Sequence, residues 1–509
     1  MSKKVRVRFA PSPTGPLHIG GVKTALVNYL YAKKHGGDFI IRVEDTDSKR
    51  EVAGSDQYMF DSLFWLKLGI DESPWTGGPY GPYRQSERKD IYKKYVDELI
   101  KLGHAYYAFD TKEELDKMRE DLAATGIKNT GYTGVVREKM NNSLRMSPAD
   151  VKNKIDAGEP YVVRFKMSRN EDVKFEDKIR GWVTFNTKDL DDKVIWKSSD
   201  QLPTYHLANV VDDHLMEITN VIRGEEWLSS TPLHVLLYKA FGWEHPEFAH
   251  LPLILGPDGK KLGKRNKYGI PVFPLSWTYT DPDGVVESIQ GFRELGYEPD
   301  ALINFLALLG WSPGGNREFM SMSEMIELFD VDRINQAGAR FDMVKLNSFN
   351  AHYLRSKNRE WILEKMNIPE NHGLSDEKLS ILAKMATERV TFAHELAGSV
   401  DYIFNEPDLS GELDMKNVND FVRVMNVFAD DEFMADFNED EWTIEHIKME
   451  LETISVNVSS SVGKIMPMLR LALTGGKPGP QLIDVMYVIG SKKTKNRINV
   501  LLSKIKETA

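Results

Sequence analysis

Residues 5–47, VRVRFAPSPTGPLHIGGVKTALVNYLYAKKHGGDFIIRVEDTD, decide the fold. Val5, Val7 and Phe9 alternate with two arginines, which is the two-residue period of a β-strand. A turn rich in proline and glycine (11–21) follows, and the apolar residues of 22–30 are then spaced as one face of a helix. The next apolar run ends on acidic residues, as a buried parallel strand would. Strand, turn, helix and strand predict a βαβ unit and a doubly wound parallel sheet.

The spacing of apolar and charged residues divides the rest of the chain into segments. Residues 106–190 are charged and weakly periodic, which predicts an α+β domain inserted into the Rossmann-like α/β domain. The parallel-sheet pattern returns at residue 191, and beyond about residue 325 only helical patterns occur. We therefore predict an interrupted α/β domain followed by an all-helical part. The expected boundaries are 1–105, 106–190, 191–250, 251–325 and 326–509.

Composition narrows the class of protein. Of the 509 residues, 41% are hydrophobic and 28% charged, which is ordinary for a globular protein. No apolar stretch reaches the ~18 residues of a membrane span, and the charged N-terminal sequence lacks the apolar segment of a secretory signal. The absence of cysteine excludes disulfides, thiolate zinc sites and a cysteine nucleophile. We expect a cytoplasmic protein without a membrane partner.

The net charge of -10 conceals a strong asymmetry. Residues 401–455 hold sixteen acidic and three basic side chains, whereas residues 461–509 hold nine basic and two acidic ones. Because phosphate binding depends on a local patch, this distribution is compatible with a nucleic-acid partner. A solvated charged surface is the alternative.

The turn PSPTGPLHIGG (11–21) has the features of a phosphate-binding loop. Its glycines allow close approach to the backbone, and it leads into a helix N-terminus, which favours anions. Thr14 and His18 can add hydrogen bonds to phosphate oxygens. The turn is neither a Walker loop nor a GxGxxG motif, and taken alone it could simply connect a strand to a helix.

A second basic element lies in LPLILGPDGKKLGKRNK (251–267), which carries five lysines and arginines. Lys261 and Lys264, three residues apart, can clamp a pyrophosphate whose negative charge grows in a transition state. Taken alone, this segment could be a solvated basic loop.

Together the two elements resemble the signature of the class I aminoacyl-tRNA synthetases. The turn 11–21 is similar to their HIGH motif, and KLGKR (261–265) is similar to their KMSKS loop. With RVEDTD (42–47), PTYHLANVVDDHL (203–215) and VIRGEEW (221–227) between them, the whole chain resembles the bacterial-type glutamyl-tRNA synthetases.

Two positions depart from the motifs. Gly21 stands at the fourth position of HIGH, a replacement common in glutamyl enzymes, and Gly263 replaces the middle serine of KMSKS. The second change removes a hydroxyl and loosens the loop but leaves both lysines. The resemblance therefore implies Lys264 as the main pyrophosphate-stabilising residue, supported by Lys261, with His18 as a further catalytic residue. It implies an ATP site made of Thr14, His18, Gly20, Gly21, Trp227, Lys261 and Lys264.

An amino-acid pocket for glutamate needs cations for two carboxylates and an anion for the ammonium. Arg8 and Arg223 can each form bidentate pairs with a carboxylate, and Glu44 can hold the ammonium. The resemblance implies that the same pocket is lined by Ala10, Ser12, Tyr205 and Asn209. Arg8 could instead be a surface arginine, Glu44 a helix cap, and Tyr205 and Trp227 core aromatics.

The implied activity is that of a glutamate–tRNA ligase. Glutamate attacks the α-phosphorus of ATP, giving glutamyl-adenylate and pyrophosphate, and the terminal ribose of tRNA(Glu) then takes the glutamyl group. A buried Arg223 favours glutamate, because neutral glutamine would leave its charge unpaired. We expect Mg²⁺ on the triphosphate, no zinc, and a monomer. The inserted domain would bind the tRNA acceptor end. In the helical C-terminal part, residues 466–482 and SKKTKNR (491–497) would face the RNA.

Other functions stay open. A non-discriminating enzyme would also charge glutamine tRNA, and nothing in the sequence decides between the two. A truncated relative that glutamylates a modified base lacks the helical part, and a small-molecule nucleotidyltransferase would not need it. A non-catalytic tRNA-binding paralogue would not need Lys261 and Lys264, and only Gly263 favours it.

Overall fold

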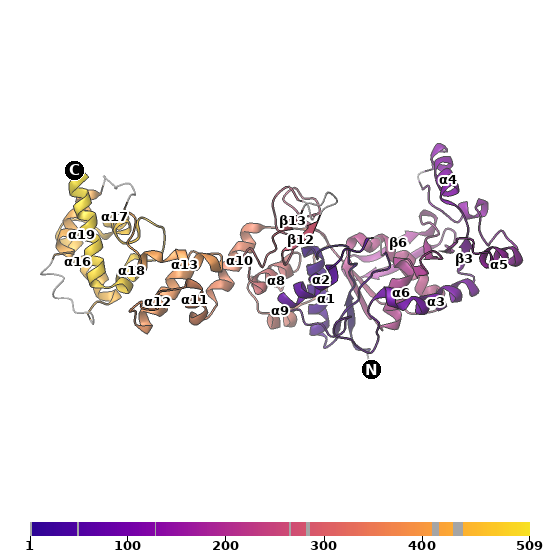
Figure 1. Ribbon diagram of the computed structural model, residues 1–509, viewed down its shortest axis with the longest axis horizontal. Coiled ribbons are helices and arrows are strands. Elements are labelled where there is room, and N and C mark those ends of the chain that lie inside the picture. Colours follow the sequence, from indigo (N-terminus) through magenta and orange to yellow (C-terminus); the bar gives the residue numbers. More distant parts are fainter. Residues whose placement is uncertain are drawn as a thin grey trace. The chain divides into compact units, whose positions relative to one another are not determined.

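The computed structural model describes residues 3–47, 50–127, 129–263, 266–280, 286–409, 417–430 and 441–508 (Figure 1). The chain forms two compact units, one of residues 1–295 and 302–343 and the other of residues 296–301 and 344–509. The division runs through helix α8 (Pro299–Leu308). In the described ranges no helix combines the length and the apolar character needed to cross a membrane.

The first unit is built on a six-stranded sheet of order β2-β1-β9-β10-β5-β6. Its strands are β1 (Arg6–Phe9), β2 (Asp38–Ile41), β5 (Asp172–Asp177), β6 (Gly181–Asn186), β9 (Asn220–Gly224) and β10 (Glu247–Leu251). The strands from β2 to β10 in this order run parallel. The predicted parallel-sheet fold is confirmed.

The helices of this unit connect and flank its strands. They are α1 (Ile19–Lys34), α2 (Ser55–Trp65), α3 (Lys89–Lys101), α4 (Lys112–Ala124), α5 (Pro148–Asp156), α6 (Tyr205–Leu215), α7 (Thr231–Phe241) and α9 (Met322–Leu328). Two small strand pairs complete the unit: β11 (Ile254–Leu255) with β14 (Ala339–Arg340), and β12 (Trp277–Thr280) with β13 (Val286–Ile289).

The segment expected as a separate insertion, 106–190, is shared between two sheets. A four-stranded antiparallel sheet is formed by β3 (Ala105–Ala108), β4 (Val162–Phe165), β7 (Val194–Lys197) and β8 (Leu202–Pro203). The β5–β6 hairpin instead joins the parallel sheet, where Asp177 pairs with Phe248 of β10. Strand periodicity predicts which face of this hairpin is buried, but it does not predict which strand the hairpin pairs with. The pairing of β5 with β10 therefore crosses the boundary expected at residue 190.

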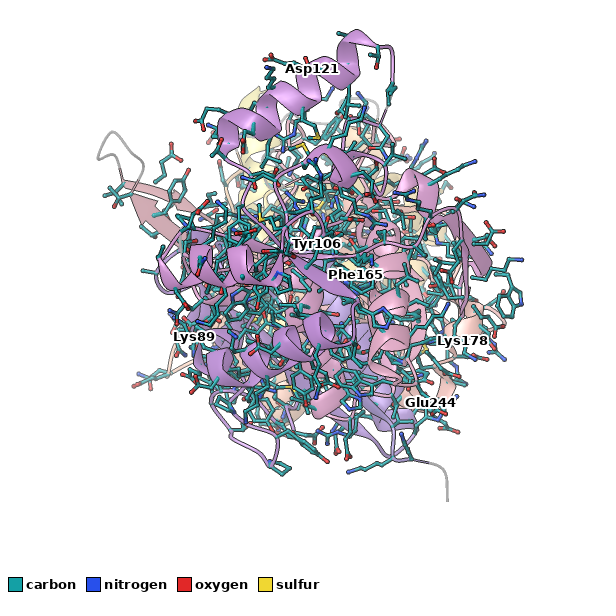
Figure 2. The ribbon with its side chains drawn as sticks, turned by 90° about the vertical axis from the view of Figure 1, so that its right-hand side faces the viewer. Lys89, Tyr106, Asp121, Phe165, Lys178 and Glu244 are labelled. Carbon is teal, nitrogen blue, oxygen red and sulfur yellow. The ribbon has the colours of Figure 1, made fainter. Side chains whose placement is uncertain are left out.

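A buried polar cluster holds the antiparallel part together. Asp192 accepts hydrogen bonds from the Tyr106 hydroxyl (2.6 Å), from Nη1 of Arg137 (3.0 Å) and from the Met167 backbone N–H (3.0 Å). Figure 2 faces this region, with Tyr106 marking β3 and Asp121 marking α4 above it. Because the buried carboxylate of Asp192 has hydrogen-bond partners on both oxygens, the cluster connects the strands of this sheet to the segments packed beside them.

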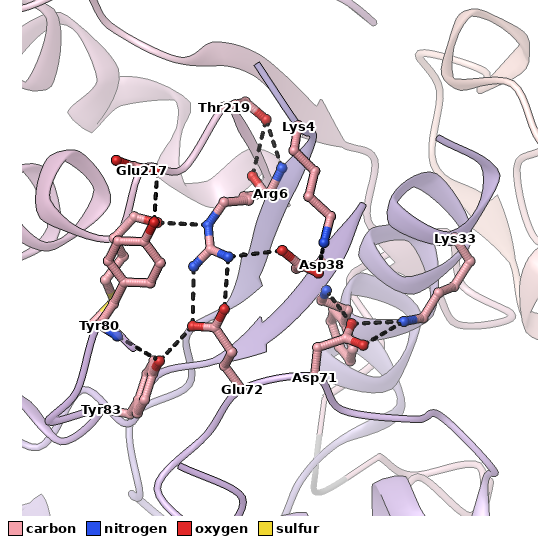
Figure 3. Close-up of polar contacts among 12 residues, drawn as sticks. Lys4, Arg6, Lys33, Asp38, Asp71, Glu72, Tyr80, Tyr83, Glu217 and Thr219 are labelled. Carbon is pink, nitrogen blue, oxygen red and sulfur yellow. Dashed lines mark hydrogen bonds and ion pairs between the residues drawn. The ribbon is translucent and has the colours of Figure 1, made fainter. Parts of the chain in front are cut away.

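A second cluster fixes the amino end of β1. Arg6 donates to both carboxylate oxygens of Glu72 (2.7 and 3.1 Å) and to Asp38 (2.9 Å), and its guanidinium lies 4.3 Å from the centre of the Tyr80 ring (Figure 3). The Tyr83 hydroxyl donates to the same Glu72. This end of the strand is therefore tied to its neighbours by charge-assisted bonds.

Lys23 is a buried cation on α1. Among the described residues its Nζ makes no hydrogen bond. Burial lowers the pKa of Lys23 to about 8, although the negative charge of Glu225 acts in the other direction. The side chain therefore lowers the stability of the folded protein when it is protonated.

The second unit is helical. Besides the start of α8 it contains α10 (Met343–Arg355), α11 (Arg359–Met366), α12 (Asp376–Thr387), α13 (Leu396–Ser399), α14 (Val418–Phe428), α16 (Ile444–Asn457), α17 (Val462–Thr474), α18 (Leu482–Ile489) and α19 (Ser491–Thr508) (Figure 1). Leu354, Phe421, Leu469 and Met486 belong to a large hydrophobic core in this unit. The predicted all-helical C-terminal part is confirmed, but it begins near residue 344 and not at 326, because strand β14 (Ala339–Arg340) belongs to the first unit.

One expectation for this unit is wrong in part. In SKKTKNR (491–497), expected to face RNA, Lys492 and Lys493 are exposed, but Arg497 is only 2% exposed. Arg497 donates to the backbone oxygens of Leu473 (3.0 Å) and Asn405 (2.9 Å). Burial lowers its pKa. The residue faces the helical core because its guanidinium satisfies two otherwise open carbonyl groups.

Candidate active site

A cavity of about 920 Å³ opens beside the carboxyl ends of β1 and β9. Twelve of the site residues expected from the sequence line it, namely Arg8, Ala10, Ser12, Thr14, His18, Gly20, Gly21, Glu44, Tyr205, Asn209, Arg223 and Trp227. Lys261 does not line it, and Lys264 lies outside the described residues. The structure thus brings together side chains that are more than 200 residues apart in sequence.

The turn after β1 is shaped by its glycines and by a helix cap. His18 Nδ1 accepts a hydrogen bond from the Gly20 N–H (3.0 Å) and caps α1. Gly15 has a φ of +126°, which a side chain would disfavour. A Cβ at Gly21 would lie 2.7 Å from Cδ1 of Leu17. A side chain at Gly21 would therefore require Leu17 to shift, and both Gly20 and Gly21 line the cavity.

Arg8 is a buried residue and not a surface arginine. It is 3% exposed, and its Nε and Nη2 donate to the two carboxylate oxygens of Asp213 (2.9 and 3.2 Å). Burial on its own would raise the pKa of Asp213, but the guanidinium groups of Arg8 and Arg42 outweigh it and lower the pKa. Both bonds use one edge of the guanidinium, and within the described ranges Nη1 of Arg8 makes no hydrogen bond, so it can donate to a ligand.

Glu44 lies on the other side of the same network. Its Oε1 accepts from Nη2 of Arg42 (3.0 Å) and from Nδ2 of Asn209 (3.2 Å). Burial raises the pKa of Glu44, although the charges of Arg42 and Arg8 act to lower it. In the described part of the chain both hydrogen bonds go to Oε1, so Oε2 can accept from a ligand ammonium.

A further carboxylate, Asp212, supports this network from behind. Its oxygens accept from Nε of Arg88 (2.7 Å), Nε2 of Gln85 (2.9 Å) and the Tyr92 hydroxyl (2.8 Å). Arg42 Nε lies 3.7 Å from it. The charges of the buried arginines Arg8, Arg42 and Arg88 are therefore matched by those of Glu44, Asp212 and Asp213.

Arg223, near the end of β9, has no carboxylate among its hydrogen-bond partners in the described residues. Nε donates to His250 Nε2 (3.1 Å), Nη1 to the Tyr205 hydroxyl (3.0 Å), and Nη2 to the Thr231 hydroxyl (2.8 Å). A longer contact of 3.4 Å joins Nη1 to His234 Nδ1. A 5% exposed guanidinium held by neutral groups can take an anion from the cavity.

The two aromatic residues of the site pack against each other in a tilted arrangement and do not belong to the core. The ring centres of Tyr205 and Trp227 are 4.4 Å apart, and Trp227 is 40% exposed. Because the Tyr205 hydroxyl accepts from Arg223, its own hydrogen is free to be donated into the cavity. Trp227 offers an open aromatic face at the rim.

Lys261 extends from the loop after β11. Its Nζ lies 3.4 Å from Oε1 of Glu226, and both side chains are exposed. Glu226 lines the cavity. The ammonium is therefore near the cavity but held outside its lining by an exposed ion pair, which is a weak contact.

Among the residues beside the cavity that the sequence analysis did not single out are His250 and Asp177. His250 lies beside Arg223 in the register of β10 with β9, and its Nδ1 is 2.6 Å from Oδ2 of Asp177. The position of His250 directly before the segment 251–267 is the one sequence feature that could have indicated it. Nothing in the sequence connected Asp177, 73 residues away, with it.

The described ranges contain no group of three or more His, Asp or Glu side chains that could hold a metal ion.

Comparison with known proteins gives two family matches that together span most of the chain. Residues 4–348 match the family described as tRNA synthetases class I (E and Q), catalytic domain, and residues 352–502 match the family described as anticodon binding domain. The boundary between them lies close to that between the two compact units.

Individual proteins are similar over nearly the whole length. A glutamate–tRNA ligase of Bacteroides thetaiotaomicron is 49% identical over 97% of this chain and 98% of its own, and that of Amoebophilus asiaticus is 46% identical over 99% and 98%. The crystal structure of a glutamate tRNA ligase from Elizabethkingia meningosepticum, in complex with its amino acid, is 44% identical. It has a TM-score of 0.86 and covers 98% of this chain and 99% of its own.

Proposed function

The chain belongs to the class I glutamyl-tRNA synthetases, and from that premise we propose how its residues carry out the reaction. It is a glutamate–tRNA ligase, whose substrates are ATP, glutamate and tRNA(Glu). The observation that carries the assignment of the amino-acid site is Arg223, a buried guanidinium without a carboxylate partner in a cavity of about 920 Å³.

Glutamate binds with its side-chain carboxylate against Arg223 and the Tyr205 hydroxyl. Its ammonium lies at Oε2 of Glu44, and Nη1 of Arg8 supplies the second cation of the pocket. Glutamine would present a neutral amide to Arg223 and leave a buried charge without compensation, which costs several kcal/mol. Ala10, Ser12 and Asn209 complete the lining.

ATP lies along the turn 11–21, with its phosphates near Thr14, His18 and the backbone of Gly20 and Gly21, and its adenine near Trp227. Lys261 leaves Glu226 to reach the pyrophosphate, together with Lys264. Asp47 and Glu51 in the cavity wall are oxygen donors of the type that Mg²⁺ takes, and they would help to hold an ion that neutralises charge on the triphosphate. No zinc is needed, because the chain has no cysteine and Asp192 holds the antiparallel sheet.

Catalysis then consists of orientation and charge stabilisation. The α-carboxylate of glutamate displaces pyrophosphate from the α-phosphorus, and the 3′-terminal ribose hydroxyl of tRNA displaces AMP from the adenylate. Fixed cations where the charge of the leaving pyrophosphate develops lower the barrier of the first step. We further propose that the protein is monomeric and cytoplasmic and that adenylate formation requires bound tRNA.

The test is charging of purified tRNA(Glu) and tRNA(Gln) with labelled glutamate and ATP, alongside pyrophosphate exchange with and without tRNA. Charging of tRNA(Glu) alone is the expected result. Charging of both would identify a non-discriminating enzyme. Binding of tRNA without any charging would contradict the proposal and identify a non-catalytic paralogue.

A further inference from the structure

Arg223 is connected through a histidine to a buried carboxylate that does not touch the cavity. His250 Nδ1 lies 2.6 Å from Oδ2 of Asp177, and His250 Nε2 lies 3.1 Å from Nε of Arg223. His250 is 0% and Asp177 1% exposed. We propose that Asp177 and His250 are positioning residues that hold Arg223 oriented and cationic for the glutamate side chain; this rests on the proposed role of Arg223.

The hydrogen-bond donors and acceptors of Asp177 and Arg223 determine which ring nitrogen of His250 carries the hydrogen. A guanidinium nitrogen can only donate, so His250 Nε2 must accept from Arg223 and carries no hydrogen. The ring hydrogen is then on Nδ1, where it is donated to Asp177. Burial, joined by the charge of Arg223, lowers the pKa of His250, although Asp177 acts in the other direction. His250 is therefore a neutral spacer between an anion and a cation.

Asp177 is itself held in one orientation. Its Oδ1 accepts from three backbone N–H groups, those of Ile179 (3.0 Å), Arg180 (2.9 Å) and His250 (3.4 Å), which leaves Oδ2 for the imidazole. The β5–β6 turn and β10 thus fix the carboxylate. The carboxylate in turn fixes which ring nitrogen of His250 faces Arg223.

A second neutral histidine, His234, contacts Arg223 at Nη1. His234 Nδ1 lies 3.4 Å from Nη1, and His234 Nε2 lies 3.2 Å from His206 Nδ1. Burial, with the charge of Arg223, lowers the pKa of His234 well below its ordinary value. Two neutral histidines therefore orient the guanidinium from two sides without neutralising it. Its positive charge is left for a carboxylate from the cavity, and discrimination against a neutral amide depends on that charge.

The decisive variant is Asp177→Asn, which keeps the shape of the side chain. The three backbone donors hold the amide oxygen at the position of Oδ1, so the amide NH₂ faces His250 Nδ1. The imidazole must then accept there and carry its hydrogen on Nε2, directly opposite the N–H of Arg223. The Thr231 hydroxyl, 3.1 Å from Nε2, can accept that hydrogen, but the Nε–H of Arg223 then loses its acceptor and faces a donor, which displaces the guanidinium. The matched control is Asp172→Asn on the same strand, where an exposed carboxylate accepts from Asn186 (2.8 Å).

The measurement is tRNA(Glu) charging with full-length protein, with KM determined separately for glutamate and for ATP. For Asp177→Asn we expect the KM for glutamate to rise roughly 10- to 100-fold, the effect of losing one hydrogen bond to a charged group. The KM for ATP should stay within about twofold, and Asp172→Asn should match the wild type. An unchanged KM for glutamate overturns the proposal, as does an equal rise in both KM values, which would indicate a purely structural role.

A second pair of variants tests the same point should Asp177→Asn fail to fold. His250→Gln retains an acceptor for Arg223 and a donor for Asp177, whereas His250→Phe retains neither. We expect only His250→Phe to raise the KM for glutamate, and equal effects of the two variants overturn the proposal.

Arg223→Lys separates this inference from the proposed role of Arg223 on which it rests. If that variant leaves the KM for glutamate unchanged, the role of Arg223 fails and the inference with it. If it raises the KM while Asp177→Asn does not, only the inference fails.

Discussion

Arg8 and Asp213 form a bidentate ion pair, with distances of 2.9 and 3.2 Å, that is almost completely removed from solvent. Asp213 also accepts from Nη1 of Arg42 (2.7 Å), so one carboxylate holds two guanidinium groups that lie beside the cavity. The pair joins β1 to α6, and the stability of the fold and the geometry of the pocket depend on the same atoms.

Asp213→Asn should therefore be costly. Breaking a buried pair leaves uncompensated charge, and we expect the free energy of unfolding to fall by about 3–5 kcal/mol. Urea denaturation measures this directly. Asp97→Asn, which removes an exposed partner of Lys93, is the control and should cost less than about 1 kcal/mol. Equal stability of the two variants would show that the Arg8 pair contributes nothing to folding.

Lys23→Met should stabilise the protein in a pH-dependent way. The pKa of Lys23 is about 8 in the folded protein and ordinary in the unfolded chain. As the pH falls from about 10.5 to 8, the unfolded chain therefore binds the proton first, and the wild type loses stability relative to the variant. The difference in unfolding free energy between the two proteins should be complete at pH 7, at about 3–4 kcal/mol, and vanish above about pH 10.5. Unfolding free energies of both proteins from pH 7 to 10 test it; a gain independent of pH would exclude the buried charge as its cause.

Gly21→Ala should disturb the phosphate turn. The added Cβ would lie 2.7 Å from Leu17 Cδ1 and 3.5 Å from Cζ of Phe9, so the turn or Leu17 must move. We expect a loss of about 1–3 kcal/mol of stability and a higher KM for ATP. Gly69→Ala, where a Cβ meets nothing within 4 Å, is the control. Wild-type kinetics in Gly21→Ala would mean that the turn tolerates displacement.

Lys261→Ala should slow adenylate formation by about 100-fold, as expected for the loss of one group that stabilises transition-state charge. Pyrophosphate exchange in the presence of tRNA measures this step. Because the Lys261–Glu226 contact is exposed, the melting temperature should hardly change. Lys260→Ala, the adjacent exposed lysine, is the control. Equal rates for the two variants would remove Lys261 from the catalytic residues.

The sequence was most informative where a local pattern has one structural solution. Alternation of Val7 and Phe9 with the arginines predicted β1, and the glycine-rich turn predicted the start of α1. The sequence was least informative about contacts between residues that lie far apart in the chain. Arg8 and Glu44 were expected in the pocket, but their shared dependence on Arg42 and Asp213 was not. Asp177 reaches His250 only because β5 pairs with β10, a contact that periodicity does not encode. Arg497 was taken for an RNA-facing cation because composition cannot tell a basic surface from an arginine that binds buried carbonyl groups.

The cluster around Arg6 has a consequence at the far end of the same strand (Figure 3). Arg6 is held by Glu72 and Asp38, and Arg8, two residues further on, is held by Asp213. With β1 anchored at both ends, the side chain of Arg8 has lost its rotamer freedom, worth up to about 2 kcal/mol, before any substrate arrives. Binding glutamate then requires little further ordering of this side chain, because its conformational entropy is already lost when the protein folds.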